Sequence, residues 1–139
     1  MAGKRYQDLA NISPDMLRIG PDQLPSDVRT KLHSLRGMAR EGLHDLEGAL
    51  GDYDEAIRLG TKEVAPYNNA AWLRVQLGRG DFDVAWMHIQ KAVELMPDAP
   101  AVRHTAAMVL RMGGQLERAL EEIDIAIDRQ RQVVTKRGA

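Results

Sequence analysis

The side chains that most often carry chemistry are scattered along this chain of 139 residues. The histidines show neither the H-x-x-x-H nor the H-E-x-x-H spacing that places two zinc ligands on one helix face. They are His33, His44, His88 and His104. No cysteine is present to complete a ligand set or to act as a thiolate nucleophile. We therefore expect no metal site, no cofactor and no catalytic thiol.

An acidic run near the C-terminus is the next candidate, because clustered carboxylates can bind cations. It consists of Glu117, Glu121, Glu122, Asp124 and Asp128. Arginines lie three or four positions away along the same segment, and this spacing is typical of a solvated helix face. The glycine pairs lack the preceding strand and the following lysine of a phosphate-binding loop, so they indicate turns. No catalytic residues are predicted, and we expect that the protein is not an enzyme.

Charge and hydropathy narrow the classes of partner. The chain has 19 basic and 20 acidic side chains, so no global basic field attracts nucleic acid. The basic stretch at 129–137 has no interleaved aromatic residue and follows the acidic run. No segment approaches the ~18 consecutive apolar residues of a membrane span, and Lys4-Arg5 precedes no apolar core of a signal peptide. We expect a soluble, cytoplasmic protein with no nucleic-acid partner and no membrane insertion.

The elements that must position any site are helices. Aromatic residues make up 4% of the chain and hydrophobic residues 44%, with alanine, leucine and arginine plentiful, which favours helices over a β-sandwich. A short helix is expected to open at Ser13-Pro14. Residues 26–50 form either one long helix or two helices that break near Gly37. Further helices are predicted at about 53–64, 67–78, 82–95, 99–112 and 116–135.

The chain repeats itself at an offset of 34 residues. Gly80 aligns with Gly114, and Ala85 aligns with Ala119. A glycine turn is followed by small or apolar residues at steps of three and four, which is the pattern of a helix that packs on a neighbour. Upstream, residues 51–56 match residues 80–85 at an offset of 29, which predicts a third, shortened copy. In this register Gly51-Asp52, Gly80-Asp81 and Gly113-Gly114 supply the turns between paired helices.

These units resemble tetratricopeptide repeats, whose period is 34 residues. The middle unit is the best copy, with Gly80 at the turn, Phe82 after it, Ala85 and Ala92 at the small positions of the second helix, and Pro97 at the end. The resemblance implies an all-α fold, an α-solenoid of antiparallel helix hairpins in a right-handed superhelix. The repeats fall at about 37–65, 66–99 and 100–135. Residues 1–25 then form an N-terminal segment, and residues 26–139 form the repeat domain.

Tetratricopeptide domains bind proteins. The resemblance therefore implies a non-catalytic adaptor or chaperone-like module that holds a peptide or a partner protein in its concave groove. In the register of the repeats the groove positions carry Glu41, Asp45, Tyr67, Arg74, His104, Met108 and Arg111. The wall changes from acidic to basic, which favours a ligand of mixed charge or one with an acidic group near the two arginines. Asp45 disfavours the subtype that grips the C-terminal carboxylate of chaperone tails.

The last repeat offers a second surface. Repeat arrays usually end in a helix with a polar outer face, whereas the helix at 116–135 carries outward apolar residues at Leu120, Ile127 and Val134. An exposed stripe of this length usually marks an interface. This surface favours a second function, a structural subunit or scaffold that self-associates into a homo-oligomer or docks in a larger complex. The stripe would instead be covered if the N-terminal segment, or the unusually long final helix itself, folded back on it. A third alternative is that the chain is a fragment of a larger protein whose catalytic domain lies elsewhere.

Overall fold

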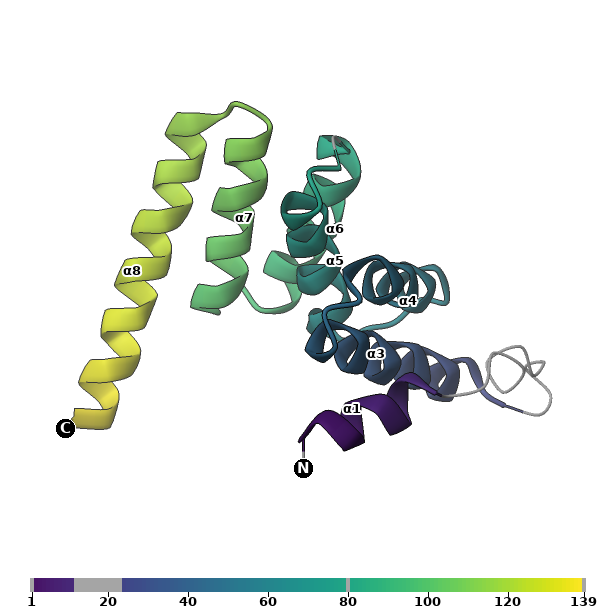
Figure 1. The fold of residues 1–139 in the computed structure, drawn as a ribbon. Coiled ribbons are helices and arrows are strands. Elements are labelled where there is room, and N and C mark those ends of the chain that lie inside the picture. Colours follow the sequence, from purple (N-terminus) through teal and green to yellow (C-terminus); the bar gives the residue numbers. More distant parts are fainter. Residues whose placement is uncertain (1, 12–23, 80, 139) are drawn as a thin grey trace. The chain divides into compact units, whose positions relative to one another are not determined.

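The computed structural model describes residues 2–11, 24–79 and 81–138. In these ranges the chain forms seven α-helices and no strand, so the all-α prediction is confirmed (Figure 1). The helices are α1 (Ala2–Ala10), α3 (Ser26–Gly42), α4 (Leu46–Arg58), α5 (Val64–Gln76), α6 (Phe82–Leu95), α7 (Pro100–Met112) and α8 (Leu116–Gly138). The short helix expected at Ser13-Pro14 lies outside the described residues.

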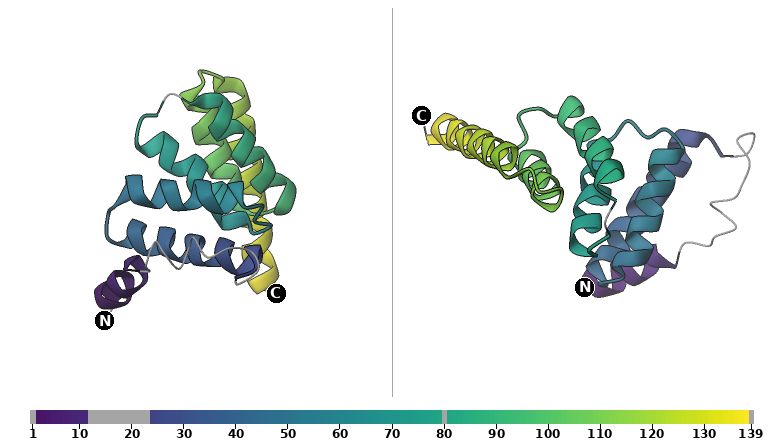
Figure 2. Two further views of the ribbon diagram at one scale, coloured as in Figure 1. Left: turned by 90° about the vertical axis from the view of Figure 1, so that its right-hand side faces the viewer. Right: turned by 90° about the horizontal axis from the view of Figure 1, so that it is seen from above.

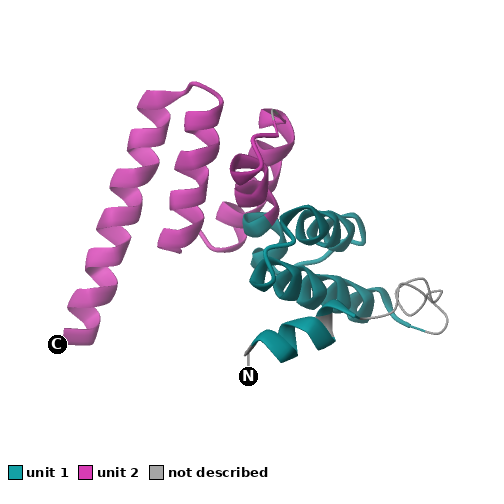
Figure 3. Ribbon diagram, viewed as in Figure 1, with its two compact units in different colours: residues 1–69 teal, residues 70–139 magenta. Residues whose placement is uncertain are grey.

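The helices belong to two compact units, Met1–Asn69 and Ala70–Ala139, and the boundary falls inside α5 (Figure 3). In the first unit α3 and α4 form an antiparallel hairpin, and α1 packs against α3. In the second unit α7 and α8 form an antiparallel hairpin, and α6 packs against α7. The views in Figure 2 show the same pairings. Each unit therefore has its own packed helices.

The three last helices were predicted correctly because their ends carry clear signals. Pro100 stands in the first turn of α7, where its missing N–H costs no hydrogen bond. After α7, Gly114 has a φ of 75°, a left-handed conformation that glycine adopts easily. The Gln115 N–H then donates to the Leu110 carbonyl at 2.9 Å and closes the turn into α8. The predictions for 82–95, 99–112 and 116–135 are confirmed, and α8 continues to Gly138.

The predicted register of the first repeat is wrong. The chain turns after Gly42, where His44 has a φ of 61° and Asp45 caps α4 by accepting a hydrogen bond from the Gly48 N–H at 3.0 Å. Helix α4 runs without a break through Gly51-Asp52, which the glycine pattern assigned to a turn. Helices α4, α6 and α8 start at Leu46, Phe82 and Leu116, which are 36 and 34 residues apart. The match at an offset of 29 is therefore not the structural repeat.

Helix α3 runs without a break through Gly37, and this glycine lies against Tyr53 of α4. A Cβ atom at Gly37 would lie 2.8 Å from Cε1 of Tyr53, whose side chain is fully buried. The absence of a side chain therefore lets the two helices approach closely. The predicted helix at 53–64 is also wrong, since α4 ends at Arg58 and Gly60, with a φ of 85°, lies in the turn before α5.

Replacing Gly51 with alanine tests the corrected register. Gly51 is exposed in the middle of α4, and a Cβ atom there meets nothing within 4 Å. Since alanine favours a helix over glycine, we expect the free energy of unfolding to rise by about 0.5–1 kcal/mol in urea denaturation. Gly60→Ala is the control and should destabilise the chain, because its φ of 85° is strained for alanine. A lower free energy of unfolding in Gly51→Ala would contradict the corrected register and support a turn at Gly51-Asp52, as the glycine pattern indicated.

Candidate functional site

Small residues bring α7 and α8 close together. Ala107 and Ala119 are buried where the two helices meet, and Leu110 completes this core cluster. Phe82 and Trp86 of α6 pack against the cluster, with their rings stacked at 6.2 Å between centroids. Because alanine side chains are short, the helix axes can approach and the hairpin packs tightly. The side chains on either side of this contact are therefore held in fixed positions relative to one another.

The hairpin leaves an open hollow along one side, which we call the α7–α8 groove. Its volume is about 290 Å³. Its lining is apolar apart from two residues at the edge. Leu120 is 62% exposed, so the groove is accessible from solvent. The lining residues are His104, Ala107, Met108 and Arg111 of α7 and Leu116, Ala119, Leu120 and Ile123 of α8.

The apolar wall of the groove follows from the spacing along α8. Leu116, Leu120 and Ile123 are separated by four and three residues, which places them on one face of a helix. Ile127 continues the same face and is exposed. Fully burying a leucine or isoleucine side chain stabilises by roughly 1.5–3 kcal/mol. A partner that covers the groove therefore gains favourable free energy from the burial of these side chains.

The structure brings part of the two predicted surfaces together. Three predicted groove residues, His104, Met108 and Arg111, line the α7–α8 groove beside Leu120 of the predicted terminal interface. The other interface residues, at 127 and 134, are exposed farther along α8. Arg74 lies elsewhere in the second unit and is buried, with Nη1 placed 3.5 Å from Nδ1 of His88 on α6.

The remaining predicted groove residues lie in the first unit, where each has a contact within the fold. The Tyr53 hydroxyl donates a hydrogen bond to the Glu41 carboxylate at 2.5 Å. Tyr67 is buried and donates from its hydroxyl to the Thr61 carbonyl at 2.8 Å. Asp45 caps α4 from the turn, so its predicted place within a helix is wrong. These three side chains therefore stabilise the first unit.

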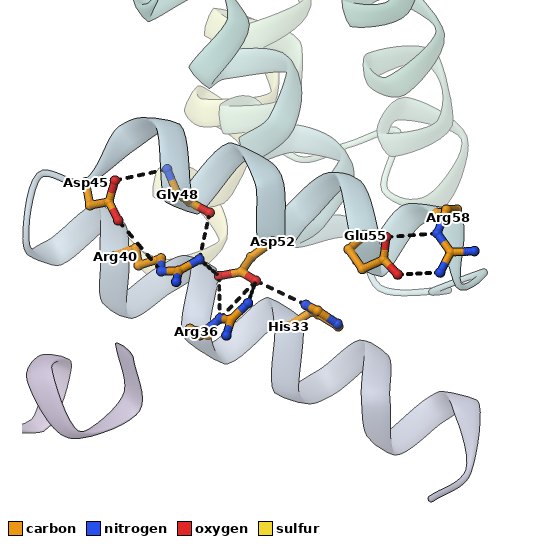
Figure 4. Close-up of polar contacts among 8 residues, drawn as sticks. All are labelled: His33, Arg36, Arg40, Asp45, Gly48, Asp52, Glu55 and Arg58. Carbon is orange, nitrogen blue, oxygen red and sulfur yellow. Dashed lines mark hydrogen bonds and ion pairs between the residues drawn. The ribbon is translucent and has the colours of Figure 1, made fainter. Parts of the chain in front are cut away.

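A buried ionic cluster, which the residue spacing did not reveal, joins α3 to α4 (Figure 4). The Asp52 carboxylate of α4 is 2% exposed. Arg36 donates to it from Nε at 3.0 and 2.9 Å and from Nη2 at 2.6 Å. Arg40 Nη1 donates at 2.8 Å, and His33 Nδ1 lies 3.1 Å away. The three α3 side chains thus surround a single carboxylate.

The charge state of Asp52 follows from these neighbours. Burial on its own raises the pKa of the carboxyl group. The hydrogen bonds from His33 and Arg36 and the charges of Arg36 and Arg40 act in the opposite direction and outweigh burial, so the pKa lies below its ordinary value of 3.8. The ionised oxygens accept bonds from both arginines, which favours a structural role over a catalytic one.

Two further classes of site are absent from the described residues. No three histidine, aspartate or glutamate side chains come together there in a group that could hold a metal ion. None of the described helices is both long enough and apolar enough to cross a bilayer.

No protein-family model matches the chain, and no curated protein matches its sequence. Solved structures do match. A crystal structure of MamA superposes with a TM-score of 0.70 at 17% identity, covering 96% of this chain and 77% of that one. A crystal structure of MamA protein gives a TM-score of 0.67 at 16% identity, covering 96% and 72% of the two chains.

A third structure, MamA 41-end from Desulfovibrio magneticus RS-1, gives a TM-score of 0.66 at 16% identity and covers 92% of this chain and 75% of that one. These neighbours are helical repeat proteins of the tetratricopeptide-like kind. The likeness concerns the fold. The chain has the fold of an α-solenoid built from antiparallel helix hairpins.

Proposed function

We propose that the chain is a non-catalytic protein-interaction module, an adaptor or chaperone-like protein that binds a partner protein or peptide. The α7–α8 groove carries this proposal, because it presents the exposed Leu116 and Leu120 and the half-buried Met108 on a tightly packed hairpin. Contiguous exposed apolar surface of this kind marks interaction sites. Helical repeat folds commonly serve protein interaction and scaffolding, which supports the proposal at the level of the fold.

The residues of the groove supply different kinds of contact to a partner. Leu120 and Met108 supply apolar contact area on opposite walls, where a partner side chain would be buried between them. Arg111 at the edge can donate to a carboxylate of the partner. Glu41, Asp45 and Tyr67 are engaged within the first unit, so we centre the proposed binding surface on the second unit.

Changing Leu120 to glutamate tests the proposal. Leu120 is 62% exposed, so the substitution leaves the core intact while it places a charge in the groove. We expect the recovery of partner proteins, by affinity capture from the native source, to fall by about tenfold or more. Met87→Glu is the matched control, since Met87 is 59% exposed on α6 and outside the groove. Equal recovery by wild type and Leu120→Glu would contradict the proposal.

The second candidate function is a structural subunit that self-associates or docks in a larger complex through α8. One observation favours it: the apolar face continues beyond the groove, through exposed Ile127 and Val134. The capture experiment separates the two functions once the mass of each purified chain is measured by light scattering. If the wild-type chain is an oligomer and the Leu120→Glu chain is a monomer, the result supports self-association. A wild-type monomer that captures partners through Leu120 supports the adaptor.

A further inference from the structure

The two walls of the α7–α8 groove differ in charge: an acidic flank borders the α8 wall, and the α7 wall carries Arg111. On α8, Glu117, Glu121 and Asp124 are exposed and recur at steps of four and three, so they form one flank beside the apolar face. On α7, Arg111 and His104 are exposed and seven residues apart, which places them on one face of the helix, and both line the opposite wall of the groove beside Met108. An occupant of the groove therefore meets carboxylates on one side and, on the other, the Arg111 guanidinium with the His104 imidazole beside it.

The basic residues of α8 nearest to this acidic flank are directed elsewhere. Arg118 lies over the Trp86 ring of α6, with its guanidinium carbon 4.9 Å from the ring centroid. Arg129 pairs with Asp98 at 3.0 Å. Arg131 lies beyond Ile127, outside the groove lining. The α8 flank thus keeps its acidic character along the length of the groove.

The lining favours a helix over an extended peptide. An extended backbone needs hydrogen-bond partners, and an apolar groove that supplies few of them leaves its N–H and C=O groups unsatisfied. Here only His104 and Arg111 among the lining residues have polar side chains. A helix satisfies its own backbone and presents only side chains to the groove.

The length of the apolar face of α8 also suits a helix as the occupant. From Leu116 to Ile127 the apolar face of α8 extends about 16 Å, which equals three turns of a helix. Ala107 and Ala119 form a low floor between the two walls, where the ridge of a third helix can enter the furrow of the hairpin. A helix of three or more turns thus has anchors along its whole contact.

We infer that the α7–α8 groove binds an amphipathic helix of a partner protein whose apolar stripe is bordered by acidic residues on one flank and basic residues on the other. The acidic flank lies along Arg111 and His104, and the basic flank lies along Glu121 and Asp124. This inference rests on the proposed interaction function and adds the chemistry of the partner. The charge pattern also selects the direction in which the helix lies, because reversal would place like charges together.

Two synthetic peptides of about 20 residues test the inference, a length at which helices form readily. Both carry the same leucine stripe and the same numbers of glutamates and lysines. In the segregated peptide glutamates occupy one flank and lysines the other, and in the mixed peptide they alternate on both flanks. We expect the 139-residue chain to bind the segregated peptide about tenfold more tightly at low salt, measured by fluorescence anisotropy. The advantage should shrink in high salt.

Protein variants complete the test. Leu120→Glu should weaken the binding of both peptides about tenfold or more, while Met87→Glu should leave the affinity for both peptides unchanged. Glu121→Lys combined with Asp124→Lys, two exposed positions, should remove the preference for the segregated peptide. Circular dichroism of each variant verifies that the helices are retained.

Three outcomes would overturn the inference. Equal binding of the two peptides would contradict the proposed charge pattern of the partner. Failure of both peptides to bind would contradict a helix as the occupant of the groove. In either case a loss of natural partner on Leu120→Glu would leave the proposed interaction function standing. A wild-type chain that is dimeric by light scattering and binds neither peptide identifies a second copy as the occupant.

Discussion

Replacing Asp52 with alanine is expected to lower the free energy of unfolding by about 3–5 kcal/mol, because the buried Arg36 guanidinium then loses its counter-charge. Arg40 and His33 lose the same acceptor. Urea denaturation followed by circular dichroism measures the change. Glu55→Gln on the same helix is the matched control. Glu55 pairs with the solvent-exposed Arg58, so its loss should have a much smaller effect.

The same carboxylate makes stability depend on pH in a defined direction. The pKa of Asp52 is lowered in the folded chain, whereas the unfolded chain keeps the ordinary value of 3.8. The unfolded state therefore binds more protons near pH 4, and stability rises with pH in that region. The contribution of Asp52 is complete above its ordinary pKa and is lost as the pH falls through the lowered value. The difference in the free energy of unfolding between wild type and Asp52→Ala should therefore become smaller as the pH falls through the lowered pKa of Asp52. A difference that stays constant over this pH range would contradict a lowered pKa for Asp52.

Tyr53→Ala is expected to destabilise the first unit by a similar amount, about 3–5 kcal/mol. The Tyr53 ring is fully buried and fills the notch over Gly37, so truncation opens a cavity between α3 and α4. Tyr53→Phe keeps the ring and removes only the hydroxyl. That hydroxyl donates to Glu41 and accepts from Asn69, so we expect a cost of about 1–2 kcal/mol.

The comparison of the two Tyr53 variants separates packing from hydrogen bonding. Both are measured by urea denaturation against wild type. If Phe costs as much as Ala, the stabilisation resides in the hydroxyl, and the packing explanation for Gly37 fails. If Phe is nearly neutral, the ring carries the effect, and the hydroxyl bonds merely replace bonds to water.

The second unit could be predicted from the sequence because its local signals agree with one another. Pro100 opens α7, Gly114 turns the chain, and Ala85 and Ala119 repeat at the positions where helices pack closely. Each of these residues has a conformational preference that operates within a few residues of itself. Their agreement over two copies was sufficient for the helix bounds.

The first unit could not be predicted because its strongest glycine motif is misleading. Gly51-Asp52 resembles a turn by composition, yet a helix tolerates an exposed glycine at a modest cost. The true turn uses His44 in a left-handed conformation and Asp45 as a cap, and neither residue type is specific for a turn. Asp52 therefore appeared to be a loop residue, and its burial against Arg36 followed only from the packing of the two helices.

The candidate site was predicted in part for a similar reason. The register of the tetratricopeptide resemblance placed His104, Met108 and Arg111 among the groove positions, and the structure brings them together beside Leu120. Spacing alone does not reveal which faces of two neighbouring helices meet. The sequence therefore assigned these α7 residues and Leu120 to two separate surfaces, although they line a single groove.

The most direct test of the interaction function is the dissociation constant of a captured partner, measured with purified wild type, Leu120→Glu and Met87→Glu. The groove account predicts that Leu120→Glu weakens binding about tenfold or more and that Met87→Glu binds as wild type does. Equal affinity of all three chains would show that the partner binds elsewhere and would contradict the account.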